Sequence, residues 1–197
     1  MASESILRES TMSPSRLIIG ITGSSGIIYG LRLLEVLRTL SIETHLVVTK
    51  AGQLTRAYET THSLTELKAL ADVYYTLTDI AAPIASGSFK TMGMIVAPCS
   101  MNSLSEIARS GASNLLTRAA DVVLKERRRL VLMPREAPLH LGHLDNMIKV
   151  TQMGGIIFPP APAFYQKPKT IDDIIDDTVG RVLDMFEIES GLVKRWG

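Results

Sequence analysis

The stretch Leu17–Gly26, LIIGITGSSG, decides the fold of this chain. Its apolar half predicts a buried strand. Its second half is a turn rich in glycine and hydroxyl groups, and a helical pattern over 27–40 follows directly. A helix that starts in this way carries unpaired backbone N–H groups and the positive end of its dipole, which together favour an anion. The stretch therefore predicts a phosphate-binding turn, to which the hydroxyls of Thr22, Ser24 and Ser25 can add donors.

The glycine spacing of this turn, G-x-x-G-x-x-G from Gly20 to Gly26, does not identify the ligand. It is not the dinucleotide-binding G-x-G-x-x-G, and it is not a Walker loop because the Gly-Lys-Ser/Thr ending is missing. The alternative is a tight strand-to-helix turn without any ligand, in which Ser25 is the N-cap of the helix.

Length and composition predict one folded domain with a sizeable core, since the chain has 197 residues of which 46% are hydrophobic and 21% charged. We assign the domain to residues 16–197 and interpret the polar leader, residues 1–15, as a disordered extension rather than a signal peptide.

A net charge of +1 gives no reason to expect nucleic acid or an acidic membrane as partner. No apolar run approaches the ~20 residues that span a bilayer. The single cysteine, Cys99, fits a reducing compartment, so we expect a cytoplasmic protein.

Strand and helix patterns alternate along the chain. Short apolar strands separated by helices predict a parallel sheet covered on both faces, which is an α/β, three-layer αβα, doubly wound fold of Rossmann-like or flavodoxin-like type. Strands are expected at 17–21, 43–48, 94–97, 130–133 and 156–158, with a weaker sixth at 73–75. Helices are expected at 27–40, 50–59, 63–72, 100–108, 114–129 and 141–153, and after the capping residue Thr170.

Ligands of such sheets lie beyond the carboxyl ends of the strands. Four polar turns follow strands directly, at 22–26, 49–50, 98–103 and 134–136. The turn 98–103, which begins at the proline expected to end its strand, can bind a ring edge or a phosphate through its hydroxyls and amide. Its alternative interpretation is an ordinary cluster of helix N-cap residues.

Basic residues supply the local charge that an anionic ligand requires. Arg118, Asp121 and Lys125 share one helix face, which alone indicates a solvated salt-bridge face. Lys125, Arg135 and Arg181 come from separate elements, and cations gathered in this way can bind the phosphate of a substrate. The run 127–129, Arg-Arg-Arg, is most simply a favourable interaction with a helix dipole.

Other reactive side chains give weaker signals. Glu59 and Glu136 are candidate proton acceptors near a bound phosphate. Cys99 has no histidine nearby in sequence and is interpreted as a small buried residue. His140 and His143 have a spacing that suits a metal, but no Cys, Asp or Glu cluster accompanies them, so we expect no metal site.

Taken together, these segments resemble the flavin prenyltransferases, the UbiX/Pad family, from about residue 17 to the C-terminus. The matching pieces are TGSSG at 22–26, YG at 29–30, TKA at 49–51, ET at 59–60, ASGS at 85–88, PCS at 98–100, RAADVVLKER at 118–127, LVLMPRE at 130–136, PAFY at 162–165, Arg181 and RWG at 195–197.

The resemblance implies a Rossmann-like flavoprotein that joins a dimethylallyl group, from dimethylallyl monophosphate, to N5 and C6 of reduced FMN without a metal. Its product, prenylated FMN, serves a UbiD-type decarboxylase in ubiquinone synthesis or on aromatic acids. Members form homo-oligomers, typically dodecamers, with the active site at subunit junctions.

The resemblance also implies roles for particular residues. Flavin contacts fall on Gly23, Ser24, Ser25, Thr49, Ser100, Met101, Asn102, Ser103 and Arg135, with Arg118 near the phosphates. Contacts to the dimethylallyl phosphate fall on Ser88, Lys125, Arg135, Tyr165 and Arg181. Ser25 and Glu59 resemble the pair that manages protons at the flavin, and Glu136 resembles the group that works with the departing phosphate.

Two positions depart from the family pattern: Thr49 replaces a serine of many members, and Ile80 is aliphatic where some members carry an aromatic residue. A rival interpretation is a flavin-dependent decarboxylase of the peptidyl- or pantothenoyl-cysteine type, whose Pro-x-Met-Asn-x-x-Met-Trp loop is absent from this sequence. A third is a non-catalytic subunit that delivers FMN to a decarboxylase.

Overall fold

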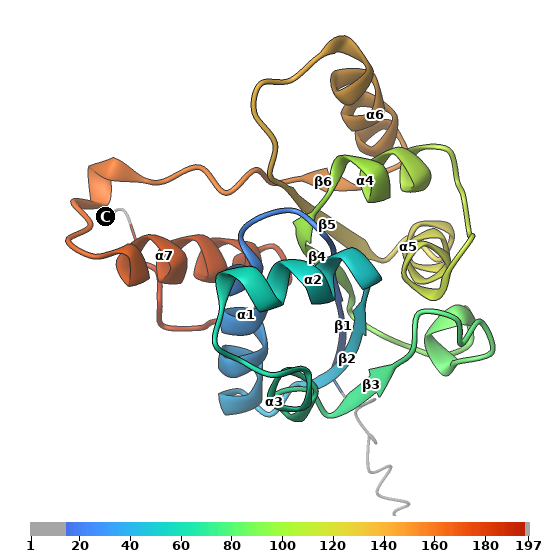
Figure 1. Cartoon of the computed structure of the whole chain (residues 1–197), viewed down its shortest axis with the longest axis horizontal. Coiled ribbons are helices and arrows are strands. Elements are labelled where there is room, and N and C mark those ends of the chain that lie inside the picture. Colours follow the sequence, from blue (N-terminus) through green and yellow to red (C-terminus); the bar gives the residue numbers. More distant parts are fainter. Residues whose placement is uncertain (1–14, 196–197) are drawn as a thin grey trace, which may run out of the picture.

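The computed structural model describes residues 15–195 and contains one sheet of six strands in the order β3-β2-β1-β4-β5-β6 (Figure 1). All neighbouring strands are parallel. The strands are β1 (Arg16–Ile21), β2 (Glu43–Val48), β3 (Val73–Tyr75), β4 (Gly93–Cys99), β5 (Arg129–Pro134) and β6 (Ile156–Ile157). The five expected strands and the weaker sixth are therefore confirmed.

The helices also follow the expected alternation. They are α1 (Ile27–Thr39), α2 (Lys50–Glu59), α3 (Leu64–Ala69), α4 (Met101–Ala108), α5 (Leu115–Lys125), α6 (Leu141–Gln152) and α7 (Ile171–Asp184), with short 3-10 turns η1 (Pro83–Ala85) and η2 (Phe164–Gln166). Ser63 and Thr170 begin α3 and α7 with reciprocal capping boxes, in which the third helical residue bonds back to the cap.

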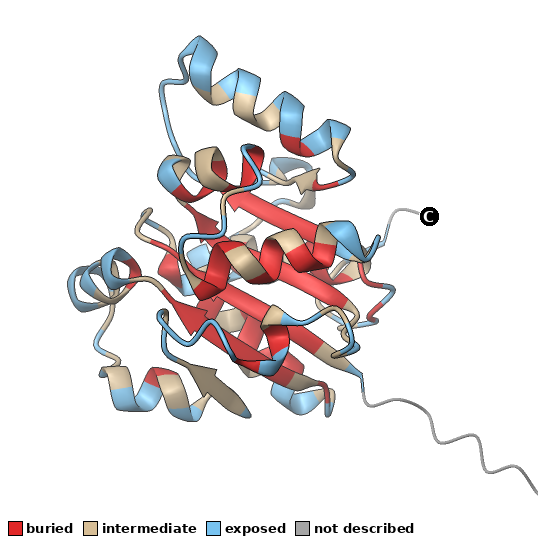
Figure 2. Cartoon of the chain, turned by 90° about the vertical axis from the view of Figure 1, so that its right-hand side faces the viewer, coloured by how far each residue is buried: buried red, intermediate tan, exposed pale blue. Residues whose placement is uncertain are grey.

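Two hydrophobic cores lie on the two faces of the sheet. Successive side chains of a strand point to opposite faces, and β1 shows this directly. Leu17 and Ile19 pack into a core formed with α1 and α7, whereas Ile18 packs into a second core formed with α4 and α5. The four inner strands β1, β2, β4 and β5 are buried along most of their length, whereas the edge strands β3 and β6 are only partly buried (Figure 2). The three-layer, doubly wound architecture is therefore confirmed, although the sheet is wholly rather than mainly parallel.

Two predicted boundaries were wrong. β4 does not end at Pro98 but continues through it to Cys99, and the register with β5 is irregular between Val96 and Cys99. Such an irregularity lets a strand contain a residue without an N–H donor. α5 ends at Lys125 rather than 129, because Arg127 takes a left-handed φ of 57° and Arg129 already belongs to β5.

Within residues 15–195, no helix combines the length and the apolar character needed to cross a membrane. The predicted extension, residues 1–15, lies outside the described residues except for its last member, and so do the final two residues of the chain.

Candidate functional site

The turns after β1 and β4 meet at the point where the strand order reverses. The chain passes from β1 through α1 to β2 on one side, whereas β4 pairs with β1 on the other. The hydroxyl of Thr22 donates to the carbonyl of Pro98 (2.8 Å) and accepts from the backbone N–H of Ser100 (2.7 Å). Thr22 is fully buried. It therefore joins the two turns, and the expectation that its hydroxyl faces a ligand was wrong.

The turn after β2 lies against the same place. The backbone N–H of Thr49 donates to the carbonyl of Ile21 (2.9 Å), and the Thr49 hydroxyl caps α2 by accepting from the N–H of Gly52 (3.0 Å). A Cβ atom on Gly23 would lie 2.4 Å from the Cβ of Ala51. The absence of a side chain at Gly23 thus allows three strand-end turns to converge.

The start of α1 is already occupied by a carboxylate of this chain. Glu59, the last residue of α2, accepts hydrogen bonds from the backbone N–H groups of Gly26 (2.8 Å) and Ile27 (3.1 Å). The prediction that these N–H groups form a phosphate-binding site was wrong. The alternative with Ser25 as N-cap was also wrong, because Gly26 holds that position with φ 104° and no side-chain cap.

Glu59 is held in its ionised form. Partial burial acts to raise its pKa, but hydrogen bonds from the Ser25 hydroxyl and from the N–H groups of Gly26 and Ile27, together with the charge of Arg135, outweigh burial and lower the pKa. Arg135 follows β5 and donates from Nε to the carbonyl of Ser25 (3.2 Å). A hydroxyl, an ionised carboxylate and a guanidinium are therefore joined beside the turn. The proton-handling role of Ser25 and Glu59 stays a prediction.

The remaining predicted flavin residues line the same edge. Ser100 caps α4 by accepting from the N–H of Ser103 (3.3 Å), so the N-cap interpretation of this turn is correct and leaves Asn102 exposed. The hydroxyl oxygen of Ser24 is buried without a hydrogen-bond partner among the described residues. An unpaired buried hydroxyl costs about 1–3 kcal/mol, and a polar ligand at this edge would relieve that cost.

Lys125 and Ser88 lie at the opposite edge of the sheet. Lys125 precedes β5, whereas Arg135 follows it, and six residues at about 3.3 Å each separate the two edges by about 20 Å. Lys125 forms an ion pair with Glu126, and a Cβ on Gly87 would lie 2.7 Å from its Nζ, so the turn carrying Ser88 rests on this ammonium group. One chain therefore does not gather Lys125 and Arg135 at one phosphate.

The other residues predicted at the phosphates make local contacts. Arg118 pairs with Asp121 (2.8 Å), as the salt-bridge interpretation of that helix face predicts. Arg181 pairs with Asp184 (2.8 Å) near the end of α7. Tyr165 belongs to η2, in the segment between β6 and α7 that runs away from the sheet (Figure 1), and is 64% exposed. Glu136 is exposed and accepts from the N–H of Ala137 (3.2 Å).

Cysteine and histidine take structural roles. Cys99 is fully buried, and burial raises the pKa of its thiol to about 12, so the thiol stays protonated, as expected of a small core residue. His140 caps α6 by accepting from the N–H of Gly142 (3.1 Å), and its ring lies against that of His143 with centroids 3.6 Å apart and the ring planes tilted by 31°. Across the described residues, no three His, Cys, Asp or Glu side chains are grouped to hold a metal ion.

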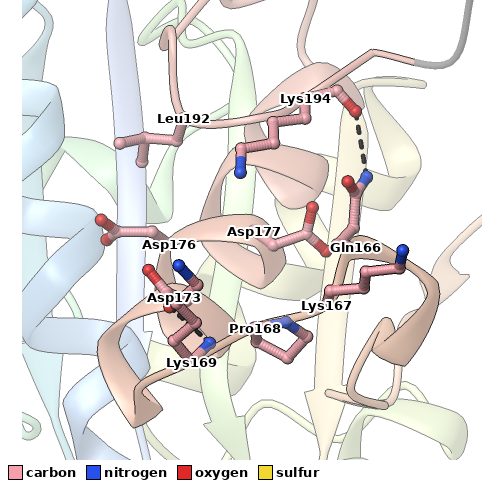
Figure 3. A pocket seen from close by; sticks show the side chains of 9 residues that line it. All are labelled: Gln166, Lys167, Pro168, Lys169, Asp173, Asp176, Asp177, Leu192 and Lys194. Carbon is pink, nitrogen blue, oxygen red and sulfur yellow. Dashed lines mark hydrogen bonds between the residues drawn. The ribbon is translucent and has the colours of Figure 1, made fainter.

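A hollow of about 300 Å³ lies elsewhere, between η2, α7 and the C-terminal segment (Figure 3). The side chain of Gln166 crosses one end of it and donates to the carbonyl of Lys194 (3.0 Å). Lysine and aspartate side chains mix along its wall, which is made of Gln166, Lys167, Pro168, Lys169, Asp173, Asp176, Asp177, Leu192 and Lys194. None of the strand-end turns contributes to it, so it is not the candidate site.

A doubly wound sheet with polar turns at its switch point is typical of proteins that bind nucleotides and flavins. The family model described as Flavoprotein matches residues 5–196, and this defines the class. The flavin prenyltransferase UbiX of Neisseria meningitidis is 56% identical over 181 residues, which cover 92% of this chain and 96% of that protein. The chain therefore belongs to the flavoprotein family, and within it to the UbiX flavin prenyltransferases.

Solved structures agree with this assignment. AnUbiX (PadA1), solved in complex with FMN and dimethylallyl pyrophosphate, has a TM-score of 0.92 and 48% identity, covering 94% of this chain and 98% of its own. A dodecameric FMN-dependent UbiX-like decarboxylase from Escherichia coli O157:H7 has a TM-score of 0.90 and 49% identity, covering 92% and 99%.

Proposed function

We propose that this protein joins the dimethylallyl group of dimethylallyl monophosphate to reduced FMN. New bonds form at N5 and C6 of the flavin, the allylic C–O bond breaks, and inorganic phosphate and prenylated FMN leave. The observation that most strongly supports this proposal is that Ser25, Glu59 and Arg135 lie together at the switch point of the sheet. The chain is also 56% identical to a flavin prenyltransferase. Prenylated FMN is the cofactor that a UbiD-type decarboxylase receives, in quinone synthesis or on aromatic acids.

We place the proposed flavin-binding site at the carboxyl edge of the sheet. Gly23 keeps the backbone open to a close ligand, the unpaired hydroxyl of Ser24 gains a partner, and Arg135 supplies positive charge. The full set is Gly23, Ser24, Ser25, Thr49, Ser100, Met101, Asn102, Ser103 and Arg135, with Arg118 near the phosphates. No metal takes part in this proposal.

Ser25 and Glu59 are proposed to manage protons. Carbon–carbon bond formation at C6 releases a proton, and the Ser25 hydroxyl can pass it to Glu59 because the two are hydrogen-bonded and Glu59 is ionised. Glu59 is fixed for this task by the two backbone N–H groups at the start of α1.

The cationic residues are proposed to bind the departing phosphate. Negative charge grows on the phosphate as the C–O bond breaks, and preorganised donors stabilise it. The donors are Ser88, Lys125, Arg135, Tyr165 and Arg181, and Glu136 is placed beside Arg135 to exchange a proton with the phosphate. The AnUbiX complex contains the pyrophosphate ester, so both esters should be compared as substrates.

Because Lys125 and Ser88 lie at the edge opposite Arg135, we propose that they serve the flavin of a neighbouring subunit in a homo-oligomer. A dodecamer like that of the Escherichia coli O157:H7 relative would supply such neighbours. Residues 16–197 would act as a single FMN-binding domain. A cytoplasmic location fits the lone, buried thiol of Cys99 and the need for reduced FMN.

Paired variants test the division between flavin and phosphate residues. Ser25→Ala and Arg181→Ala should both retain FMN, and each should lower prenyl transfer by roughly 10²-fold or more, because one removes the proton path and the other a phosphate donor. FMN retention is measured by absorbance after gel filtration, and turnover by mass spectrometry of the flavin under anaerobic conditions. Lys149→Ala, an exposed lysine on α6, controls for lost charge. Loss of FMN from Arg181→Ala, or unchanged turnover in either variant, would contradict the assignment.

A further inference from the structure

The segment that leads from η1 into β4 passes under the C-terminal end of α5. Arg128, which lies between α5 and β5, reaches this segment with both ends of its guanidinium group. It donates from Nη2 to the carbonyl of Gly87 (2.6 Å) and from Nη1 to the carbonyl of Phe89 (2.7 Å). Arginine suits two such acceptors because its donors form a rigid planar fork. The sequence interpretation of Arg128 as a partner of the α5 dipole was therefore wrong.

This double contact fixes a turn that would otherwise be pliable. The turn Ser86-Gly87-Ser88 consists of glycine and serine, which impose little conformational preference of their own. Within the turn, the N–H of Phe89 donates to the carbonyl of Ser86 (3.2 Å), the N–H of Ser88 donates to the Ser86 hydroxyl (3.4 Å), and the two serine hydroxyls are in contact (2.9 Å). Arg128 adds the bonds that hold it to the body of the protein.

The fixed turn lies directly on the Lys125–Glu126 ion pair. A Cβ added to Gly87 would lie 2.1 Å from Oε1 of Glu126 and 2.7 Å from Nζ of Lys125. The position of the turn and the position of the ammonium group are therefore coupled. The turn also carries the hydroxyls of Ser86 and Ser88. Hydroxyl and ammonium groups are donors that suit a phosphate.

We propose that Arg128 is a positioning residue for the phosphate of the substrate. Both ends of its guanidinium are used by backbone carbonyls, so it orders Ser88 and Lys125 without touching the ligand itself. Ordering these side chains before binding lowers the entropic cost of capturing the phosphate. This inference rests on the proposed function, in which Ser88 and Lys125 bind dimethylallyl phosphate.

Arg128→Gln in the full-length, FMN-loaded protein tests the inference. We expect KM and Kd for dimethylallyl monophosphate to rise about tenfold, which is about 1.4 kcal/mol, with kcat within about threefold and FMN affinity unchanged. Arg128→Lys should recover part of the loss, because an ammonium group can still bond one carbonyl. The control is Arg127→Asn, which removes the same charge from an exposed neighbour whose left-handed φ of 57° asparagine tolerates.

Gly87→Ala is a second test that leaves the Arg128 side chain unchanged, since its Cβ would clash with the Glu126 carboxylate and the Lys125 ammonium group and so displace this ion pair. It should raise KM and Kd by a similar factor, and it keeps the inference testable if Arg128→Gln folds poorly. Unchanged KM and Kd in either the Arg128→Gln or the Gly87→Ala protein, relative to Arg127→Asn, would overturn the inference. Failure of the proposed function looks different, because the wild type would then bind the phosphate ester, by isothermal titration, without making prenylated flavin.

Discussion

Glu59 shows how much one side chain can change the interpretation of a motif. The glycine-rich turn predicts an anion at the start of α1, and an anion is indeed there, but it is the carboxylate of Glu59. Sequence alone could not identify it, because Glu59 lies 32 residues from Ile27 and nothing in its neighbours marks the contact. The family resemblance singled out Glu59 for proton handling, and the structure adds its second role as the cap of α1.

The pH dependence of stability follows from Glu59. Its pKa is lowered in the folded protein, so its stabilising contribution is fully present above the unfolded value of about 4.3 and is lost as the pH falls through the lower folded value. Glu59→Gln should therefore destabilise the FMN-free protein by about 1 kcal/mol at pH 7. The difference from wild type should vanish in acid, as measured by urea unfolding at both pH values. Glu136→Gln, which removes an exposed carboxylate that accepts from the N–H of Ala137, is the matched control for lost charge. If the difference in unfolding free energy between Glu59→Gln and wild type did not change with pH, the ionised carboxylate of Glu59 would not be the source of the stabilisation.

At the scale of elements, apolar runs and capping residues were sufficient to predict the sheet and the helices that cover it. The errors came from single residues whose surroundings are not local. Pro98 was expected to end a strand, but the irregular pairing with β5 accommodates it. Lys125 and Arg135 were expected to converge on one phosphate, although the strand predicted at 130–133 already separates them, and in the structure they stand at opposite ends of β5.

The close packing of α2 on the first turn gives a prediction at this scale. Gly23→Ala would bring its Cβ against Ala51, so α2 must move away from β1. We expect FMN binding to weaken at least tenfold and stability to fall by about 1–3 kcal/mol, as for overpacking in a core. The double variant Gly23→Ala/Ala51→Gly removes the closest contact and should recover part of both losses. FMN titration and urea unfolding measure these effects, and full binding by the single variant would show that this packing is unimportant for the site.

At the scale of the whole molecule, the proposed site residues divide between two edges of one sheet. The proposed flavin residues lie at the carboxyl edge, whereas Ser88 and Lys125 lie at the amino edge, about 20 Å away by the length of β5. Large apolar side chains are also exposed, including Leu141 (71%) on α6 and Phe164 (72%) and Ile171 (76%) near the segment after β6. Both features fit a protein that completes its site and covers its surface by assembling with copies of itself.

Subunit mixing tests this division. Ser25→Ala removes a proposed catalytic hydroxyl at the carboxyl edge, and Lys125→Ala removes a proposed phosphate donor at the amino edge. A homo-oligomer of either variant should therefore be inactive. Co-expressed subunits with different affinity tags should form mixed oligomers that contain some intact composite sites and recover a measurable part of wild-type turnover. Mixed oligomers of Ser25→Ala and Glu59→Gln, both altered at one edge, are the matched control and should stay inactive. Equal inactivity of both mixtures would place the whole site within one subunit.

Whether this protein prenylates reduced FMN is decided by one anaerobic turnover experiment. The wild-type protein is incubated with reduced FMN and dimethylallyl monophosphate in the presence of a metal chelator, and the flavin is analysed by mass spectrometry. We expect conversion to a flavin heavier by one five-carbon unit, with release of inorganic phosphate. Unmodified FMN recovered from folded, FMN-loaded protein, with neither the monophosphate nor the pyrophosphate ester consumed, would contradict this expectation.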